Sequence, residues 1–150
     1  MSRYFERHTY VVTKSINAPL KFTYAWCTDY REDDNRITGS KTETKILQRT
    51  NRRVILVRAR EQNGKTMLSV KIIALHPPNA WYLDQVGEDE DVVGLYKLTR
   101  VGQKKTRLHM TFTEKYKILD APTKEQDRIA INQMWEKYVV TLENDYASKG

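Results

Sequence analysis

The chain has 150 residues, of which 39% are hydrophobic and 30% charged, and its formal net charge is +7. This balance excludes an intrinsically disordered chain, and no run approaches the ~18 apolar residues of a membrane-spanning helix. A single cysteine, Cys27, excludes an intramolecular disulfide. The length fits one domain over residues 1–150, and because the N-terminal residues contain no apolar signal region, we expect the protein to be cytoplasmic.

The first predicted elements are a strand and a helix. Residues 8–16 alternate apolar and polar side chains, which predicts a half-buried strand. Pro19 then favours the start of a helix over residues 19–30, whose apolar side chains share one face. A short second helix or a loop is expected at 33–39.

Residues 40–117 predict strands joined by short turns. Asn63-Gly64 is the strongest hairpin signal in the chain, because both residues tolerate positive φ. Short turns place consecutive strands side by side in antiparallel order, so we expect a meander. The predicted strands cover residues 42–48, 54–61, 67–74, 81–86, 92–101 and 106–116.

The last predicted element is a long helix. Thr123 and Gln126 have the spacing of a capping box at its start. This helix has the only long apolar stripe available to cover the apolar face of the sheet. The sequence therefore predicts an α+β fold, in which a curved antiparallel sheet wraps around the C-terminal helix. The stripe recurs at helical spacing and consists of Ile131, Met134, Trp135, Tyr138 and Leu142.

The opening of the chain adds a likeness to a known family. Segments Ser15–Pro19 and Phe22–Asp29 resemble the opening signature of the START-like or helix-grip superfamily (SRPBCC), which includes the major birch-pollen allergens, polyketide cyclases and coenzyme Q-binding proteins. The resemblance implies a seven-stranded antiparallel sheet that grips the last helix around a cavity, with one or two short helices after the first strand. It also implies that apolar molecules such as lipids, sterols or polyketides are bound or chemically converted. The loop at 48–53 lacks the glycines of the allergen branch.

The apolar residues expected to face the C-terminal helix are the predicted ligand contacts. They either pack a solid core or line an apolar small-molecule site. No cluster of Cys and His has the spacing of metal ligands, so we expect no metal and no cofactor. The predicted ligand-binding residues are Ile55, Val57, Val70, Ile72, Tyr96, Leu98, Met110, Phe112, Met134, Trp135 and Tyr138.

Three polar residues are candidates for acid–base chemistry in that site. Glu114 and Tyr116 continue the inward alternation of the last strand. Asp84 lies in a strand whose inward side is undecided, because Trp81 and Leu83 share the alternation opposite to that of Asp84 and compete with it for the inner face. A carboxyl group in an apolar cavity has a raised pKa and can act as a general acid or base. The alternative is that these side chains reach solvent at the mouth of the cavity.

The positive charge is concentrated in the strands. Residues 41–61 contain seven Lys or Arg against two Glu, and residues 97–117 contain seven against one. Such strands could meet nucleic acid, anionic lipid or an acidic ligand, or form a solvated outer face that resists aggregation. The solvated face is the simplest interpretation, so nucleic acid is not the expected partner.

The combined prediction is a protein that binds a hydrophobic or amphipathic small molecule between the sheet and the C-terminal helix. The molecule would be of lipid, polyketide or isoprenoid type, with or without an acidic group that the basic strands attract. One alternative is an enzyme of the cyclase or dehydratase type that uses the same cavity. Another is an interaction module whose basic sheet face binds an acidic partner. The sequence makes no prediction about oligomeric state.

Overall fold

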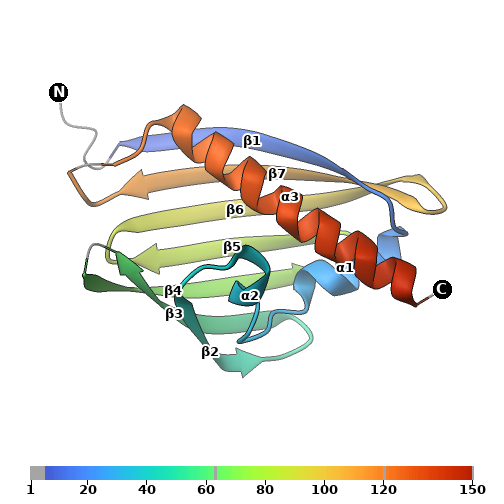
Figure 1. The fold of residues 1–150 in the computed structure, drawn as a ribbon, viewed down its shortest axis with the longest axis horizontal. Coiled ribbons are helices and arrows are strands. Elements are labelled where there is room, and N and C mark those ends of the chain that lie inside the picture. Colours follow the sequence, from blue (N-terminus) through green and yellow to red (C-terminus); the bar gives the residue numbers. More distant parts are fainter. Residues whose placement is uncertain (1–5, 63, 120, 150) are drawn as a thin grey trace.

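The computed structural model describes residues 6–62, 64–119 and 121–149. Within these residues, seven strands form one sheet and three helices accompany it (Figure 1). None of these helices is both long and apolar enough to cross a membrane. The helices are α1 (Leu20–Thr28), α2 (Asn35–Thr38) and α3 (Lys124–Ser148). The strands are β1 (Arg7–Ile16), β2 (Thr42–Arg49), β3 (Arg53–Gln62), β4 (Lys65–His76), β5 (Ala80–Gly87), β6 (Glu90–Gly102) and β7 (Lys105–Tyr116).

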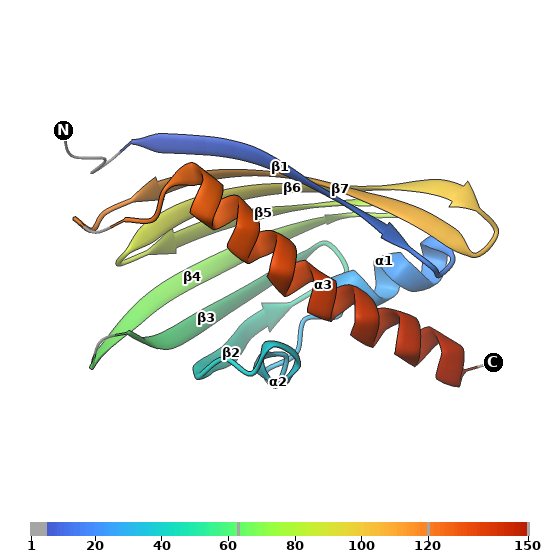
Figure 2. The same ribbon diagram turned by 45° about the horizontal axis from the view of Figure 1, so that its top comes forward.

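The sheet is an antiparallel meander to which the first strand is added at one edge. Its order is β1-β7-β6-β5-β4-β3-β2, so each strand from β2 to β7 pairs with its neighbour in sequence and β1 pairs with β7. α3 runs diagonally across one face of the sheet, and both α1 and α2 contact α3 (Figures 1 and 2). The expected fold, a seven-stranded sheet around a long C-terminal helix with short helices after the first strand, is confirmed.

The core lies between α3 and the inner face of β5, β6 and β7. Every second residue of β7 from position 106 to position 116 is buried, and the buried positions of β6 include Tyr96 and Leu98. Trp135 and Leu142 of α3 belong to the same core. The inward alternation predicted for β6 and β7 and the predicted apolar stripe of α3 are therefore confirmed.

The inward face predicted for β3 and β4 is wrong by one residue. Val54, Leu56 and Ile73 are the buried apolar residues of these strands. Because β3 and β4 are apolar on both faces, a repeat of two residues fits either alternation, and a shift of one residue exchanges the two faces. The predicted ligand contacts that lie on the outer face instead are Ile55, Val57, Val70 and Ile72, of which the last two are 39% and 42% exposed.

Local signals at a turn and at a helix start behave as predicted. Gly64, between β3 and β4, has a φ of +76°, as the hairpin turn requires, while Asn63 lies outside the described residues. At the start of α3, the hydroxyl of Thr123 accepts a hydrogen bond from the Gln126 N–H at 3.0 Å. The Gln126 side chain accepts one from the Thr123 N–H at 2.8 Å, which completes the capping box.

Candidate functional site

A cavity of about 710 Å³ lies between the inner face of the sheet and α3. Residues of α1, of α2 and of the segment that joins them, of strands β2 to β6 and of α3 line it. The chain has three tryptophans, and all of them are lining residues: Trp26, Trp81 and Trp135. This volume falls within the range of small-molecule sites in proteins.

An aromatic wall crosses the cavity from the sheet to α3. The rings of Trp81 and Tyr96 stack with centroids 4.8 Å apart and planes inclined by 10°. Tyr96 approaches Trp135 at 6.2 Å, and Trp135 meets Tyr138 edge-on at 5.1 Å. Rings that fix one another in this way present a broad apolar surface with little freedom to collapse into the cavity.

Two cations face into the cavity from neighbouring strands. Arg58 of β3 lies opposite Ser69, and Lys71 of β4 lies opposite Leu56, so the two basic residues are diagonal neighbours on the inner face. Burial lowers the pKa of both, and burial together with the adjacent Arg58 guanidinium brings the pKa of Lys71 to about 7. Within the described part of the chain, neither side chain makes a hydrogen bond or an ion pair. No direct contact therefore neutralises this positive charge.

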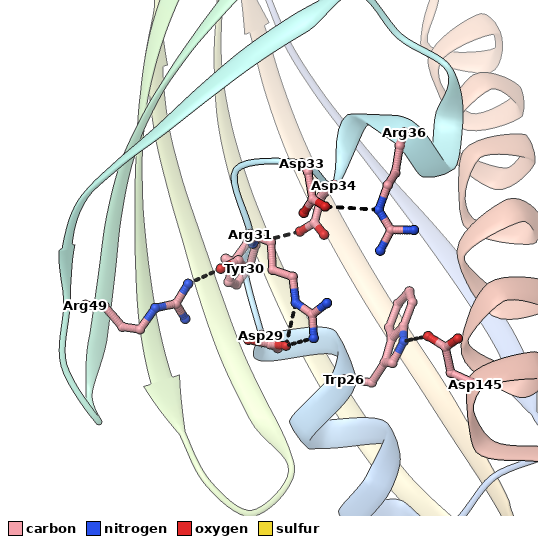
Figure 3. Close-up of polar contacts among 9 residues, drawn as sticks. All are labelled: Trp26, Asp29, Tyr30, Arg31, Asp33, Asp34, Arg36, Arg49 and Asp145. Carbon is pink, nitrogen blue, oxygen red and sulfur yellow. Dashed lines mark hydrogen bonds and ion pairs between the residues drawn. The ribbon is translucent and has the colours of Figure 1, made fainter. Parts of the chain in front are cut away.

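The acidic residues that line the cavity are already engaged by other groups (Figure 3). Asp29 pairs with Arg31 at 2.7 Å, and the Arg31 backbone N–H donates to the carboxylate of Asp34 at 3.0 Å. Asp145 of α3 accepts a hydrogen bond from the Trp26 indole N–H at 2.8 Å, which links α3 to α1. Burial is the main cause that raises the pKa of Asp34.

The segment between α1 and α2 is fixed to the edge strand β2. The Arg49 guanidinium of β2 donates a hydrogen bond to the backbone carbonyl of Tyr30 (Figure 3). In the same segment, the Glu32 carboxylate accepts a hydrogen bond from the backbone N–H of Ile46 at 2.8 Å. These contacts hold the segment in place as one wall of the cavity.

The structure brings four of the predicted ligand contacts to the cavity. They are Tyr96, Met134, Trp135 and Tyr138. Three others, Leu98, Met110 and Phe112, are buried in the core and do not line the cavity. The remaining four, Ile55, Val57, Val70 and Ile72, lie on the outer face of the sheet.

Several lining residues were missed by the sequence reasoning. The most consequential are Arg58 and Lys71, which the alternation of β3 and β4 placed on the outer face. Leu56 was missed for the same reason, since it shares their side of the sheet. Trp81 and Leu83 belong to β5, where the two alternations were equally plausible, and both prove to be buried lining residues.

Glu114 and Tyr116 face inward as predicted, but they lie in a separate acidic cluster beside the first turn of α3. Tyr10 donates to Glu114 at 2.6 Å, and Tyr116 donates to Asp127 at 2.7 Å. Glu114 is 4% exposed, and burial, aided by the nearby Asp127, raises its pKa to about 8. Neither Glu114 nor Tyr116 lines the cavity, and Asp84 is exposed on the outer face of β5. The structure therefore brings none of the three predicted acid–base residues to the cavity.

Comparison with solved structures places this architecture among known folds, whereas no family model and no curated protein matches the sequence. A START superfamily protein from Mycobacterium smegmatis superposes with a TM-score of 0.70 at 15% identity, over 95% of this chain and 99% of the other. The Zhui aromatase/cyclase from Streptomyces sp. R1128 gives 0.63 at 12% identity, over 96% and 93%. Ara h 8.0201 gives 0.70 at 16% identity, over 95% and 99%. The chain therefore has the helix-grip fold that START superfamily proteins and polyketide aromatase/cyclases share.

Proposed function

We propose that this protein binds a hydrophobic or amphipathic small molecule of lipid, polyketide or isoprenoid type in the cavity between the sheet and α3. The observation that carries the proposal is the cavity of about 710 Å³ with its wall of mutually packed aromatic rings. Burying an apolar ligand against such rings is favourable by roughly 25 cal/mol per Å² of apolar surface removed from water. Six basic side chains but only three acidic ones line the same cavity, which favours an amphipathic ligand over a purely apolar one.

The enzymatic alternative that relies on Glu114, Tyr116 or Asp84 has less support. A cyclase or dehydratase needs an acid or base within hydrogen-bonding reach of its substrate. Glu114 and Tyr116 lie beside the start of α3 outside the cavity lining, and Asp84 is exposed on the opposite face of the sheet. Binding, without an assigned catalytic residue, is therefore the function that we propose.

Filling the cavity should prevent binding. Leu56→Phe adds a ring at a lining position that is 3% exposed, whereas Ile72→Phe makes the same kind of change on the outer face. We expect N-phenyl-1-naphthylamine, a neutral dye that fluoresces in apolar surroundings, to bind the unmodified protein one-to-one. Leu56→Phe should weaken that binding roughly tenfold, which corresponds to ~1.4 kcal/mol, and Ile72→Phe should leave it unchanged.

The measurement is a fluorescence titration, with circular dichroism to confirm that both variants are folded. Because all three tryptophans line the cavity, quenching of their emission by energy transfer to the dye gives a second readout from the same samples. Equal affinity of Leu56→Phe and the unmodified protein, or a loss confined to Ile72→Phe, would show that the dye binds elsewhere and would contradict the proposal.

A further inference from the structure

We infer that Arg58 and Lys71 form an anion-binding subsite inside the cavity, so that the ligand of this protein is an amphipathic organic acid whose anionic head group lies between these two side chains. This inference rests on the proposed function, because it concerns the same cavity. It adds the chemical class of the ligand and the residues that select it.

Arg58 and Lys71 have no counter-ion in direct contact among the residues that the structure describes. Two like charges that lie diagonally on adjacent strands repel each other, and moving them out of water costs free energy unless an opposite charge compensates. The acids that act electrostatically on them are Asp34 on Arg58 and Glu90 on Lys71. Burial raises the pKa of both carboxyl groups, and neither makes an ion pair with these cations within the described residues.

The two cations adjoin the aromatic wall along the inner face of the sheet. On the inner face, Lys71 is followed along β4 by Ile73, which pairs with Leu83 of β5. Two residues before Leu83 on that strand lies Trp81, paired and stacked with Tyr96. The cavity therefore has a cationic end at β3 and β4 and an aromatic end at β5 and β6, where Trp135 of α3 approaches Tyr96. This arrangement is complementary to a molecule with an acid group at one end and a hydrocarbon or ring system at the other.

The hydrogen-bond donors of Arg58 and Lys71 suit an oxyanion. A guanidinium offers paired N–H donors in a plane, and an ammonium offers three more, so together they can satisfy both oxygens of a carboxylate. Hydrogen bonds between charged partners are roughly twice as strong as those between neutral ones, and a partly dehydrated site strengthens them further. A carboxylate bound here would neutralise charge that the protein leaves uncompensated.

The test compares two dyes with the same ring system. Anilinonaphthalene sulfonate carries an anionic group, and N-phenyl-1-naphthylamine lacks it. Both are titrated at pH 6, below the pKa of Lys71, into the unmodified protein, Arg58→Met and Lys71→Met. The matched controls are Arg107→Met and Lys97→Met, which remove exposed cations from the outer face of β7 and β6.

We expect the unmodified protein to prefer the sulfonate dye, and each cavity variant to lose roughly tenfold in affinity for that dye. The affinity of these variants for the neutral dye should change by less than about twofold. Both outer-face controls should keep the preference. Dodecanoate should displace the bound sulfonate dye at lower concentration than dodecanol does, because only the carboxylate can use the two cations.

The possible failures are distinguishable. If both dyes bind the unmodified protein and both cavity variants equally well, the anion subsite is refuted while the proposed ligand binding stands. If neither dye binds the unmodified protein, the proposed function itself is contradicted. Should the methionine variants not fold, the neutral but polar Arg58→Gln and Lys71→Gln replace them. Loss of the preference for the sulfonate dye in these folded variants supports the subsite, and retained preference refutes it.

Discussion

Replacing Glu114 by glutamine is expected to remove much of the dependence of the protein's stability on pH between about 5 and 8. In the folded protein Glu114 is 4% exposed, and burial together with Asp127 raises its pKa to about 8. In the unfolded chain the carboxyl group returns to its ordinary pKa. Between these two values the folded state therefore holds a proton that the unfolded state has released.

The sign of the effect follows from this difference in bound protons. Stability rises with pH where the unfolded state binds more protons, so here, where the folded state binds more, the free energy of unfolding falls as pH rises. One proton gives a slope of up to ~1.4 kcal/mol per pH unit. Glu90, whose pKa burial raises to about 7, acts in the same direction, and Lys71, whose pKa burial lowers to about 7, acts in the opposite direction above pH 7. Both groups contribute in both proteins. Subtracting the curve of Glu114→Gln from that of the unmodified protein isolates Glu114.

Urea denaturation followed by circular dichroism at pH 5, 6, 7 and 8 measures this difference. Glu114→Gln should gain stability relative to the unmodified protein as the pH increases. The control is Glu43→Gln on β2, because Glu43 is exposed and should give a curve parallel to that of the unmodified protein. Parallel curves for Glu114→Gln as well would show that Glu114 ionises normally in the fold.

The second large effect is expected when the contact between α3 and the sheet is weakened. Leu142 of α3 is 0% exposed and belongs to the main core, whereas Val140, one half-turn earlier, is 57% exposed. Leu142→Ala should destabilise the protein by ~3 kcal/mol, because it removes buried methyl groups and leaves a cavity that the surroundings fill only in part. Val140→Ala should change stability by less than ~0.5 kcal/mol.

Thermal unfolding of the two variants provides the measurement, and Leu142→Ala is expected to lower the Tm by roughly 10 °C. The size of the loss matters because one face of α3 supplies Trp135 and Tyr138 to the cavity wall while Leu142 anchors the helix. Equal effects of the two substitutions would mean that the helix does not rest on the sheet through Leu142, and the described position of the cavity would be contradicted.

The parts of the fold that sequence reasoning predicted correctly are those with one strongly apolar face. In β7, Leu108, Met110 and Phe112 alternate with polar residues, so only one alternation buries the apolar side chains. In α3, the apolar stripe and the capping box at Thr123 mark both the buried face and the start of the helix. These local signals agree with the tertiary structure, in which the apolar faces of β7 and α3 are buried in the same core.

The cationic end of the cavity could not be predicted in the same way. Residues 54–57 of β3 are four consecutive apolar side chains, so the alternation was decided by Arg58 and its neighbours, and charged residues usually face solvent. Arg58 and Lys71 do not follow this general preference, since both side chains line the cavity. Departures from local rules are expected at functional sites, which is why these two residues carry the inference about the ligand.

The outer face of the sheet also exposes apolar side chains, among them Val70, Ile72 and Tyr82. The most direct measurement therefore distinguishes an inner from an outer binding surface. Intermolecular nuclear Overhauser effects between bound N-phenyl-1-naphthylamine and the protein report which side chains lie next to the dye. We expect contacts to Trp81, Tyr96 and Trp135. Contacts to Val70, Ile72 and Tyr82 in their place would contradict binding in the cavity.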